Sequence, residues 1–267
     1  MSTNEPVLAV QDGVLRFGGI VALDGVTFEV EQGTTFGVIG PNGAGKTALL
    51  NCISGIYRLN SGSISLFGNA IHNEQPNRIS ALGLSRTFQS TDHFMHFSVL
   101  DYVMLGRLHL SRCSMFGSVV LWPIRQRSER AERRIVMNLL ERAGLASYAR
   151  QNLSDLPYGV QKLVDIARAM AGDAKIVLLD EPTSGTTTSE REDVSRTVRM
   201  IADSGVTTVL IDHDVAFVTR HCDRLIVMNY GMSLGVGTPK EMLQRPDVVE
   251  AFLGGLIEVD DLETVPE

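Results

Sequence analysis

The chain has 267 residues, of which 44% are apolar and 21% are charged, an ordinary globular composition that can bury a sizeable core. Its 24 basic and 31 acidic residues give a formal net charge of −7, which disfavours a protein that binds nucleic acid through a basic surface. The three cysteines form no CxxC pair and no stretch reaches the roughly 18 uninterrupted apolar residues of a membrane span, so we expect one cytoplasmic-type domain without disulfides.

The first third of the chain predicts strands on either side of a glycine-rich loop. Residues 26–31 and 62–68 alternate apolar and polar side chains, which is the period of half-buried strands. Residues 34–40, with the sequence TTFGVIG, form a run that is typical of a buried strand. The glycine-rich loop follows this run, and residues 46–56 then have a helical pattern.

The remainder of the chain predicts a helical region followed by alternating strands and helices. Residues from about 90 to 172 are helical in pattern; within them Ala131, Ile135 and Leu139 step by four, and Gly144 can end that helix. Residues 175–180 and 207–214 are apolar runs that end in acids, and a helical pattern over 189–203 separates them. Such a βαβ series predicts an α/β fold with a parallel sheet.

Two segments carry a strong local charge. Residues 107–134 hold seven Arg against two Glu, a local charge of +5, and residues 258–267 hold five acids and no base. We interpret the acidic tail as solvated surface. The basic segment fits the same interpretation, with contact to anionic lipid or to a partner as the alternative.

The glycine-rich loop matches the P-loop pattern G-x-x-x-x-G-K-(S/T) in full, and it has the required strand before it and helix after it. Glycines let backbone N–H groups turn inward around phosphate oxygens, and the helix N-terminus adds a partial positive charge. We expect Lys46 to reach the β- and γ-phosphates and the Thr47 hydroxyl to be a ligand of Mg²⁺. The complete pattern disfavours a turn that merely joins strand to helix. The predicted nucleotide-binding residues are Gly40, Pro41, Asn42, Gly43, Ala44, Gly45, Lys46 and Thr47.

A second motif completes a nucleotide site. The apolar run 176–179 ends in Asp180 and Glu181, at the carboxyl end of a buried strand, where open α/β sheets place their ligands. We expect Asp180 to hold the Mg²⁺ shell and Glu181 to polarise the attacking water. An apolar strand that ends in two acids is a weak signal alone, but with a P-loop it predicts a P-loop ATPase.

Three further segments indicate the kind of ATPase. Residues 156–162, LPYGVQK, precede a helix that ends near Gly172; Gln89 lies in SRTFQS, and His213 follows the apolar strand TTVLI. With these segments in this order, the chain resembles an ABC transporter ATPase subunit over about its whole length. In that family's terms residues 40–47 are Walker A, 156–160 the signature and 176–181 Walker B, while Gln89 is the Q-loop and His213 the switch histidine.

The resemblance implies one ABC nucleotide-binding domain over residues 1–267. Its fold would be a RecA-like P-loop core with an antiparallel β subdomain and an α-helical subdomain at about 90–172. The implied cofactors are ATP and Mg²⁺, with Lys46, Glu181 and His213 as catalytic residues and with Thr47, Gln89 and Asp180 around the metal. Phe17 would stack on adenine, a sensible role for an aromatic ring, and Gly159 would contact nucleotide. Taken alone, Phe17 would ordinarily be a core residue, Gln89 would more often be a surface amide, and His213 would more often be a strand-end histidine with its hydrogen bonds satisfied.

The ends of the chain and the long helical insert resemble one subtype. Residues 237–254 are similar to the C-terminal element of branched-chain (hydrophobic) amino acid importer ATPases, and SRTFQ with the insert resembles the LivG-type member. The implied partners are a second ATPase, either LivF-type or another copy of this chain, two permease subunits and an external solute-binding protein. The implied location is the cytoplasmic face of the membrane. Import of urea, amides or another small solute, and a soluble non-transport ABC ATPase, are the alternatives.

Two departures from the family pattern concern contacts between subunits. Pro157 and Val160 stand where the signature usually has Ser and Gln, and Thr187 stands where the D-loop usually has Asp. Proline supplies neither a hydroxyl nor an N–H donor. We therefore expect the two ATP sites of a dimer to be unequal, which favours a heterodimer.

Overall fold

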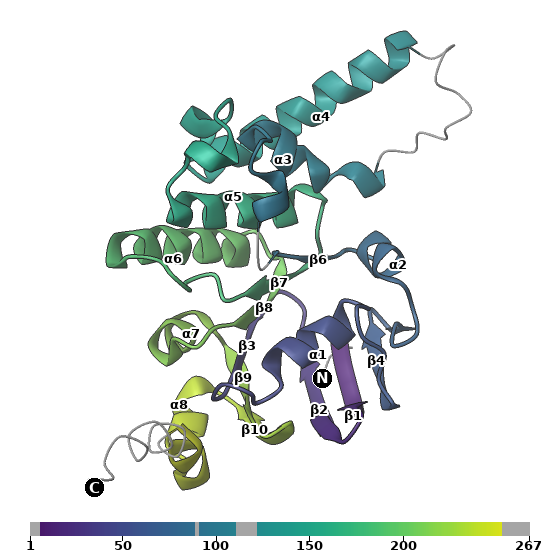
Figure 1. The fold of residues 1–267 in the computed structure, drawn as a ribbon, viewed down its shortest axis with the longest axis vertical. Coiled ribbons are helices and arrows are strands. Elements are labelled where there is room, and N and C mark those ends of the chain that lie inside the picture. Colours follow the sequence, from purple (N-terminus) through teal and green to yellow (C-terminus); the bar gives the residue numbers. More distant parts are fainter. Residues whose placement is uncertain (1–5, 89–90, 111–121, 253–267) are drawn as a thin grey trace, which may run out of the picture.

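The structure is a computed structural model, and it describes residues 6–88, 91–110 and 122–252. Figure 1 shows helices α3, α4 and α5 at one end of the molecule and strands β1, β2 and β4 toward the other. The strands are β1 (Leu8–Phe17), β2 (Ile20–Val30), β3 (Thr35–Ile39), β4 (Ser61–Leu66), β5 (Asn69–Ala70), β6 (Leu84–Arg86), β7 (Ile176–Asp180), β8 (Thr207–Ile211), β9 (Arg224–Asn229) and β10 (Met232–Gly237). The helices are α1 (Lys46–Ile53), α2 (Pro76–Ala81), α3 (Val99–Leu105), α4 (Trp122–Arg142), α5 (Tyr158–Ala171), α6 (Thr188–Asp203), α7 (Val215–His221) and α8 (Pro239–Leu243).

A six-stranded sheet in the order β10-β9-β3-β8-β7-β6 forms the centre of the molecule. Strands β9, β3, β8, β7 and β6 are parallel, and β10 pairs with β9 in the antiparallel sense at the edge. Val38, Ile211 and Asp180 lie level across β3, β8 and β7, because Ile211 pairs with both of the others. The carboxyl ends of β3 and β7 therefore lie at one edge of the sheet, one strand apart.

Alternate residues of the central strands enter two separate hydrophobic cores. Val177 and Leu179 of β7 pack with the helices α3 to α7, whereas Ile176 and Leu178 face α1 and the smaller sheet. That sheet has four strands in the order β2-β1-β4-β5, all antiparallel. Parallel strands that are covered on both faces must be apolar on both faces. This explains why the sequence shows continuous apolar runs here and an alternating pattern in β2 and β4.

The α/β class with a parallel sheet is confirmed, and most predicted elements lie where the sequence indicated.

The buried face predicted for α4, with Ala131, Ile135 and Leu139, is wrong by one position. Ile135 is 44% exposed, whereas Val136 and Leu140 are fully buried. Residues three or four apart share a helix face, and the sequence offers two adjacent apolar rows here; the row that meets α3 and α5 is the one with Val136.

Part of the predicted features lies outside the described residues. This holds for Gln89, for residues 111–121 of the basic segment and for the acidic tail 258–267. Of the predicted C-terminal element 237–254, α8 and a helical segment at 246–252 are described. Among residues 6–88, 91–110 and 122–252, no helix combines the length and the hydropathy that a bilayer span requires.

Candidate nucleotide-binding site

The P-loop connects β3 to α1 and lies in close contact with neighbouring backbone. A Cβ atom at Gly40 would overlap the carbonyl oxygen of Met228, and one at Gly45 would overlap that of Ala22. Gly45 also has a φ of 98° immediately before α1 begins, a conformation that favours glycine. The motif therefore needs glycine at both positions for steric reasons that hold before any ligand is considered. Of the other loop residues, Ala44 is buried, Pro41 is half-buried, and Asn42, Gly43 and Thr47 are exposed.

Lys46 folds back across the loop. Its side chain is buried, and Nζ donates hydrogen bonds to the carbonyl oxygens of Gly40 (2.7 Å) and Pro41 (2.9 Å). An ammonium group has three donors, so one remains for a phosphate oxygen. Burial lowers the pKa of Lys46, and the nearby charges of Glu181 and Asp180 partly oppose this shift. The ammonium group is thus held in a poorly hydrated position, where a phosphate would be a strong partner.

Asp180 ends β7 and is almost fully buried, with 3% of its surface exposed. It forms an ion pair with Arg86 at 2.7 Å, and Arg86 itself is mostly buried. The other guanidinium nitrogen of Arg86 donates to Asn51 Oδ1 (2.7 Å) on α1 and to the Oγ atom of Ser54 (3.0 Å), the C-cap residue of that helix. Sequence reasoning missed Arg86, although it lies three residues before Gln89 in the segment that was singled out.

Glu181 follows directly and has an unusual backbone. Its φ is 47°, in the left-handed region that L side chains rarely adopt. The conformation is held by a hydrogen bond from Glu181 N to Ile211 O (2.8 Å) and by two donors to its own carbonyl oxygen, from Ser184 N and Lys162 Nζ. Strain of this kind costs about 1–3 kcal/mol and is concentrated at functional sites. The backbone thus turns the Glu181 side chain away from the direction that a continued strand would give it.

The end of β8 adds a buried carboxylate that the sequence analysis did not assign. Asp212 is fully buried and accepts hydrogen bonds from Thr183 N (3.1 Å), Thr183 Oγ1 (2.6 Å) and Asp214 N (3.0 Å). It therefore ties the segment after Glu181 to β8. His213 lies next to it with its side chain 55% exposed and Nδ1 3.5 Å from Asp212 Oδ1. Asp212 directly follows the apolar strand β8, and this position is the sequence signal that could have identified it.

The donor set at this edge fits Mg²⁺ that arrives with nucleotide. The Thr47 hydroxyl and the Asp180 carboxylate are hard oxygen donors of the type that this ion prefers. No cluster of three or more His, Cys, Asp or Glu side chains that could hold a metal occurs within the described residues. Mg²⁺ usually binds through one or two carboxylates together with substrate phosphates rather than in an all-protein cage, and the site has this character.

The aromatic residue predicted for adenine lies on the surface beside the P-loop unit. Phe17 ends β1, is 47% exposed, and meets Tyr57 edge to face with ring centroids 5.1 Å apart. An exposed ring of this size is available to stack on a flat base. Tyr57, which follows α1, was not predicted.

The signature segment begins α5. Pro157 is the N-cap residue and makes no side-chain capping bond, and Val160 is half-buried against the helical core. The amide of Gly159 donates to Glu190 Oε1 (3.1 Å). Glu190 also completes a capping box with Thr187 at the start of α6, and these bonds lower the pKa of Glu190. Thr187 therefore performs the capping role that the usual Asp would perform, and its lack of a carboxylate does not disturb α6.

A buried network joins α5 to the segment that precedes Gln89. Asp165 accepts hydrogen bonds from Phe88 N (2.6 Å), Tyr102 Oη (2.7 Å) and Arg168 Nε (2.7 Å). Arg168 in turn donates to the carbonyl oxygen of Arg86 (2.7 Å) and lies 3.8 Å from the centroid of the Phe88 ring. The last described residues before Gln89 are thus fixed to α5 at both residue 86 and residue 88.

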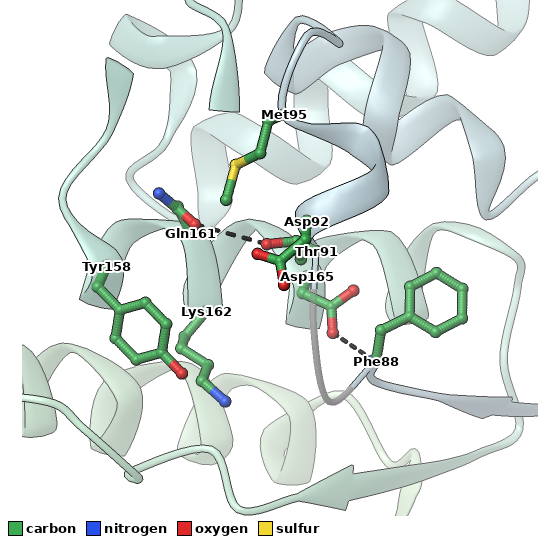
Figure 2. A pocket seen from close by; sticks show the side chains of 8 residues that line it. All are labelled: Phe88, Thr91, Asp92, Met95, Tyr158, Gln161, Lys162 and Asp165. Carbon is green, nitrogen blue, oxygen red and sulfur yellow. Dashed lines mark hydrogen bonds between the residues drawn. The ribbon is translucent and has the colours of Figure 1, made fainter. Parts of the chain in front are cut away.

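A cavity of about 350 Å³ opens between this segment and the first turns of α5. Figure 2 shows Tyr158 and Lys162 on one side of it and Phe88 on the other, with Met95 above them. Phe88 and Tyr158 are 42% and 49% exposed. The cavity therefore presents aromatic surface beside the predicted Q-loop, at a position that is separate from the P-loop. Its lining residues are Phe88, Thr91, Asp92, Met95, Tyr158, Gln161, Lys162 and Asp165.

Comparisons with known proteins support the resemblance seen in the sequence. Residues 23–184 match the family described as ABC transporter. Among curated proteins, the chain is 33% identical over 252 residues to the high-affinity branched-chain amino acid transport ATP-binding protein BraF of Pseudomonas aeruginosa, and the match covers 94% of this chain and 99% of BraF. It is 32% identical, with the same coverage, to the corresponding protein LivG of Escherichia coli strain K12.

Solved structures give the same result for the fold. An ATP-binding cassette of an ABC transporter in its ADP conformation superimposes with a TM-score of 0.82 at 28% identity, covering 94% of this chain and 99% of that one. A nucleotide-free cassette also has a TM-score of 0.82, at 27% identity. The predicted P-loop core with its antiparallel and helical parts is therefore confirmed as an ABC ATPase fold.

Proposed function

Because the chain belongs to the ABC transporter family and is an ATP-hydrolysing, ATP-binding subunit of an importer, we propose that its cargo is a branched-chain or another small amino acid. The observation that supports this most is the similarity to BraF and LivG along almost the whole length of both chains. The P-loop, Asp180 and Glu181 that the ATPase reaction needs are all present at one edge of the sheet.

The residues around the P-loop have distinct proposed roles in hydrolysis. The loop amides, the N-terminus of α1 and the free donor of Lys46 bind the β- and γ-phosphates. Glu181 accepts a proton from water while the water oxygen bonds to the γ-phosphorus and the bond to the ADP oxygen breaks, giving ADP and phosphate. Mg²⁺ bound with the nucleotide would neutralise phosphate charge, with Thr47, Asp180 and Gln89 around it. His213 donates a hydrogen bond to the γ-phosphate.

Two other regions of the chain are proposed to contact the adenine base and the second ATPase subunit. Phe17 stacks on adenine, and its exposure beside the P-loop unit supports this role. The Gly159 amide at the start of α5 faces the nucleotide of a second ATPase subunit. We propose a LivF-type chain as that second subunit, so that the two chains close on two ATP molecules and reopen after hydrolysis.

An importer ATPase works with permease subunits, and we propose that two of them hold this chain at the cytoplasmic face of the membrane. The cavity between Phe88 and Tyr158 supports a docking position beside Gln89, because it combines a hollow with exposed aromatic rings. An external solute-binding protein would deliver the amino acid to the permeases and would not contact this chain.

The test is co-expression of this chain with candidate permeases and a candidate ATPase partner, followed by reconstitution with a solute-binding protein. We expect the chain in the membrane fraction only when permeases are present, with uptake of leucine that depends on ATP. Glu181→Gln should keep nucleotide binding and slow hydrolysis by about 10²–10⁴-fold, the range for one general base. Wild-type turnover in Glu181→Gln would refute the role of Glu181, and uptake of another solute class without leucine would refute the proposed cargo.

A further inference from the structure

The ion pair between Arg86 and Asp180 places a positive charge on the carboxylate proposed to face Mg²⁺. The two side chains are 13% and 2% exposed, and they lie 2.7 Å apart. A carboxylate this deeply buried is costly without a partner, so the ion pair explains how Asp180 remains in place before a metal arrives. The same contact means that Arg86 and Mg²⁺ must share one carboxylate.

Arg86 is fixed from three directions. Its guanidinium group binds Asn51 on α1 and the C-cap residue Ser54 in addition to Asp180. Its carbonyl oxygen accepts a hydrogen bond from Arg168 on α5 at 2.7 Å. One residue therefore touches the P-loop helix, the strand that carries Asp180 and the signature helix, so Arg86 cannot move away from Asp180 without changing contacts to α1 or α5.

We propose that Arg86 is a positioning residue that opposes Mg²⁺ at Asp180, so that the nucleotide site binds the metal less tightly than its oxygen donors alone would allow. Two cations that share one carboxylate repel each other, and the repulsion is strong where water is excluded. The coupling is reciprocal: tighter pairing of Arg86 weakens Mg²⁺, and bound Mg²⁺ loosens Arg86. This inference rests on the proposed nucleotide site.

The contacts between residues 86–88 and α5 connect the competition between Arg86 and Mg²⁺ to the proposed docking face. Arg168 and Asp165 hold residues 86 and 88 against α5, and the cavity proposed for the permease begins at Phe88. A displacement of this segment would therefore alter the Arg86–Asp180 contact directly. Through it, the docking face would adjust Mg²⁺ affinity at the nucleotide site without any contact between the permease and the metal.

The test measures how much Mg²⁺ the full chain needs to bind a fluorescent ADP analogue, so that no hydrolysis is involved. In Arg86→Gln the half-saturating Mg²⁺ concentration should fall by about five- to tenfold, within the usual range of coupling between two sites. Arg86→Lys keeps the charge and should stay near the wild-type value. Arg168→Gln removes the carbonyl anchor together with the Asp165 ion pair and leaves the Arg86 guanidinium in place; it should shift the requirement in the same direction by a smaller factor.

Arg107→Gln is the matched control. Arg107 is also a buried arginine packed on α5, where it donates to Ala171 O (2.5 Å) and pairs with Glu132 and Asp173, but it does not touch Asp180. It should lower stability without changing the Mg²⁺ requirement, and thermal unfolding followed by circular dichroism identifies any variant that does not fold.

The outcomes separate this inference from the proposed function. If the wild-type chain does not bind the ADP analogue at any Mg²⁺ concentration, the nucleotide site itself is refuted. If wild type binds and folded Arg86→Gln needs as much Mg²⁺ or more, Arg86 does not oppose the metal and the inference is overturned. If only Arg168→Gln matches wild type, the link to α5 is overturned.

Discussion

Lys46 is a buried lysine whose ammonium group is held by the P-loop itself. Its ammonium group already donates to two carbonyl oxygens of the P-loop, and burial lowers its pKa. In Lys46→Ala the nucleotide loses a charge-assisted hydrogen bond worth about 1.5–3 kcal/mol, so affinity should fall about ten- to a hundredfold. Equilibrium titration with a fluorescent nucleotide measures this. Lys175→Ala, which removes an exposed lysine directly before β7, is the control and should bind like wild type; an equal loss in both variants would contradict a specific role for Lys46.

At the residue scale, the sequence revealed groups whose partners are close in the chain. Lys46 bonds to carbonyl oxygens five and six residues earlier, so a contiguous motif contains the whole arrangement. Asp180 and Arg86 are 94 residues apart, and Thr183 and Asp212 are 29 apart. Only the parallel pairing of β6, β7 and β8 brings these pairs together. A single sequence shows no local pattern for such pairings. Sequence reasoning therefore missed Arg86 as the ion-pair partner of Asp180 and Asp212 as the hydrogen-bond partner of Thr183.

At the scale of elements, helices α6 and α7 meet through a pair that should make stability depend on pH. Ser195 on α6 is buried and lies 2.7 Å from His221 Nε2 on α7. Burial, together with the positive charges of Arg199 and Arg220, lowers the pKa of His221 to about 4, and the nearby Glu192 partly opposes this shift. The ring also packs on Phe217, with centroids 4.6 Å apart. His221 is therefore neutral in the folded chain at neutral pH.

The sign of the effect follows from the depressed pKa. Between the ordinary histidine pKa of about 6.5 and the folded value of about 4, the unfolded chain takes up a proton that the folded chain does not, so stability falls as the pH falls through this window. We expect His221 to contribute a loss of about 1–2 kcal/mol between pH values of about 7.5 and 5. His221→Gln keeps a partner for Ser195 and should remove this part of the loss in urea unfolding at the two pH values. His96→Gln, at an exposed histidine, should unfold like wild type at both; an unchanged pH dependence in His221→Gln would refute the assignment.

Helix α5 shows a burial of polar residues that the pattern along the sequence does not reveal. Helix α5 is buried on nearly every side, including Asp165 and Arg168, because it lies between α3, α4 and α6. Its apolar residues Leu163, Ile166 and Ala167 recur at helical spacing, whereas its polar residues would ordinarily be placed in solvent. They are buried because Phe88 and Tyr102 bring hydrogen-bond partners from another segment. The polar network that links α5 to the segment ending at Phe88 is thus a tertiary property.

At the scale of the whole molecule, the signature segment and the nucleotide site of the same chain are separate structures. The site is built on β3, β7 and α1, whereas the signature begins α5, which packs against α3, α4 and α6. In the proposed two-chain closure, each ATP would meet the P-loop of one chain and the signature of the other. A defect in this signature would then weaken the partner's site and leave the site with Lys46 and Glu181 unaffected.

The start of α5 has fewer donors for a phosphate than a signature with serine would have. Pro157 supplies no N–H and no hydroxyl and makes no side-chain cap. The Gly159 amide is available only in competition with Glu190, which accepts its hydrogen bond. The helix N-terminus still contributes its partial positive charge, so we expect the partner's site to be weakened rather than abolished.

Pro157→Ser should therefore raise ATP turnover at the partner's site. One added charge-assisted hydrogen bond is worth about 1.5–3 kcal/mol, or about ten- to a hundredfold in affinity or rate, and a serine N-cap would stabilise α5 as well, by about 1 kcal/mol. The measurement uses the assembled transporter with the Walker B glutamate of each subunit replaced in turn, so that only one site hydrolyses ATP. Pro157→Ser should accelerate the complex in which Glu181 is replaced and leave the converse complex unchanged. Added helix stability would act on both complexes alike, so an increase confined to the partner's site identifies the missing phosphate donor. Equal turnover from both sites, with no response to Pro157→Ser, would show that LPYGV binds phosphate as well as the common signature.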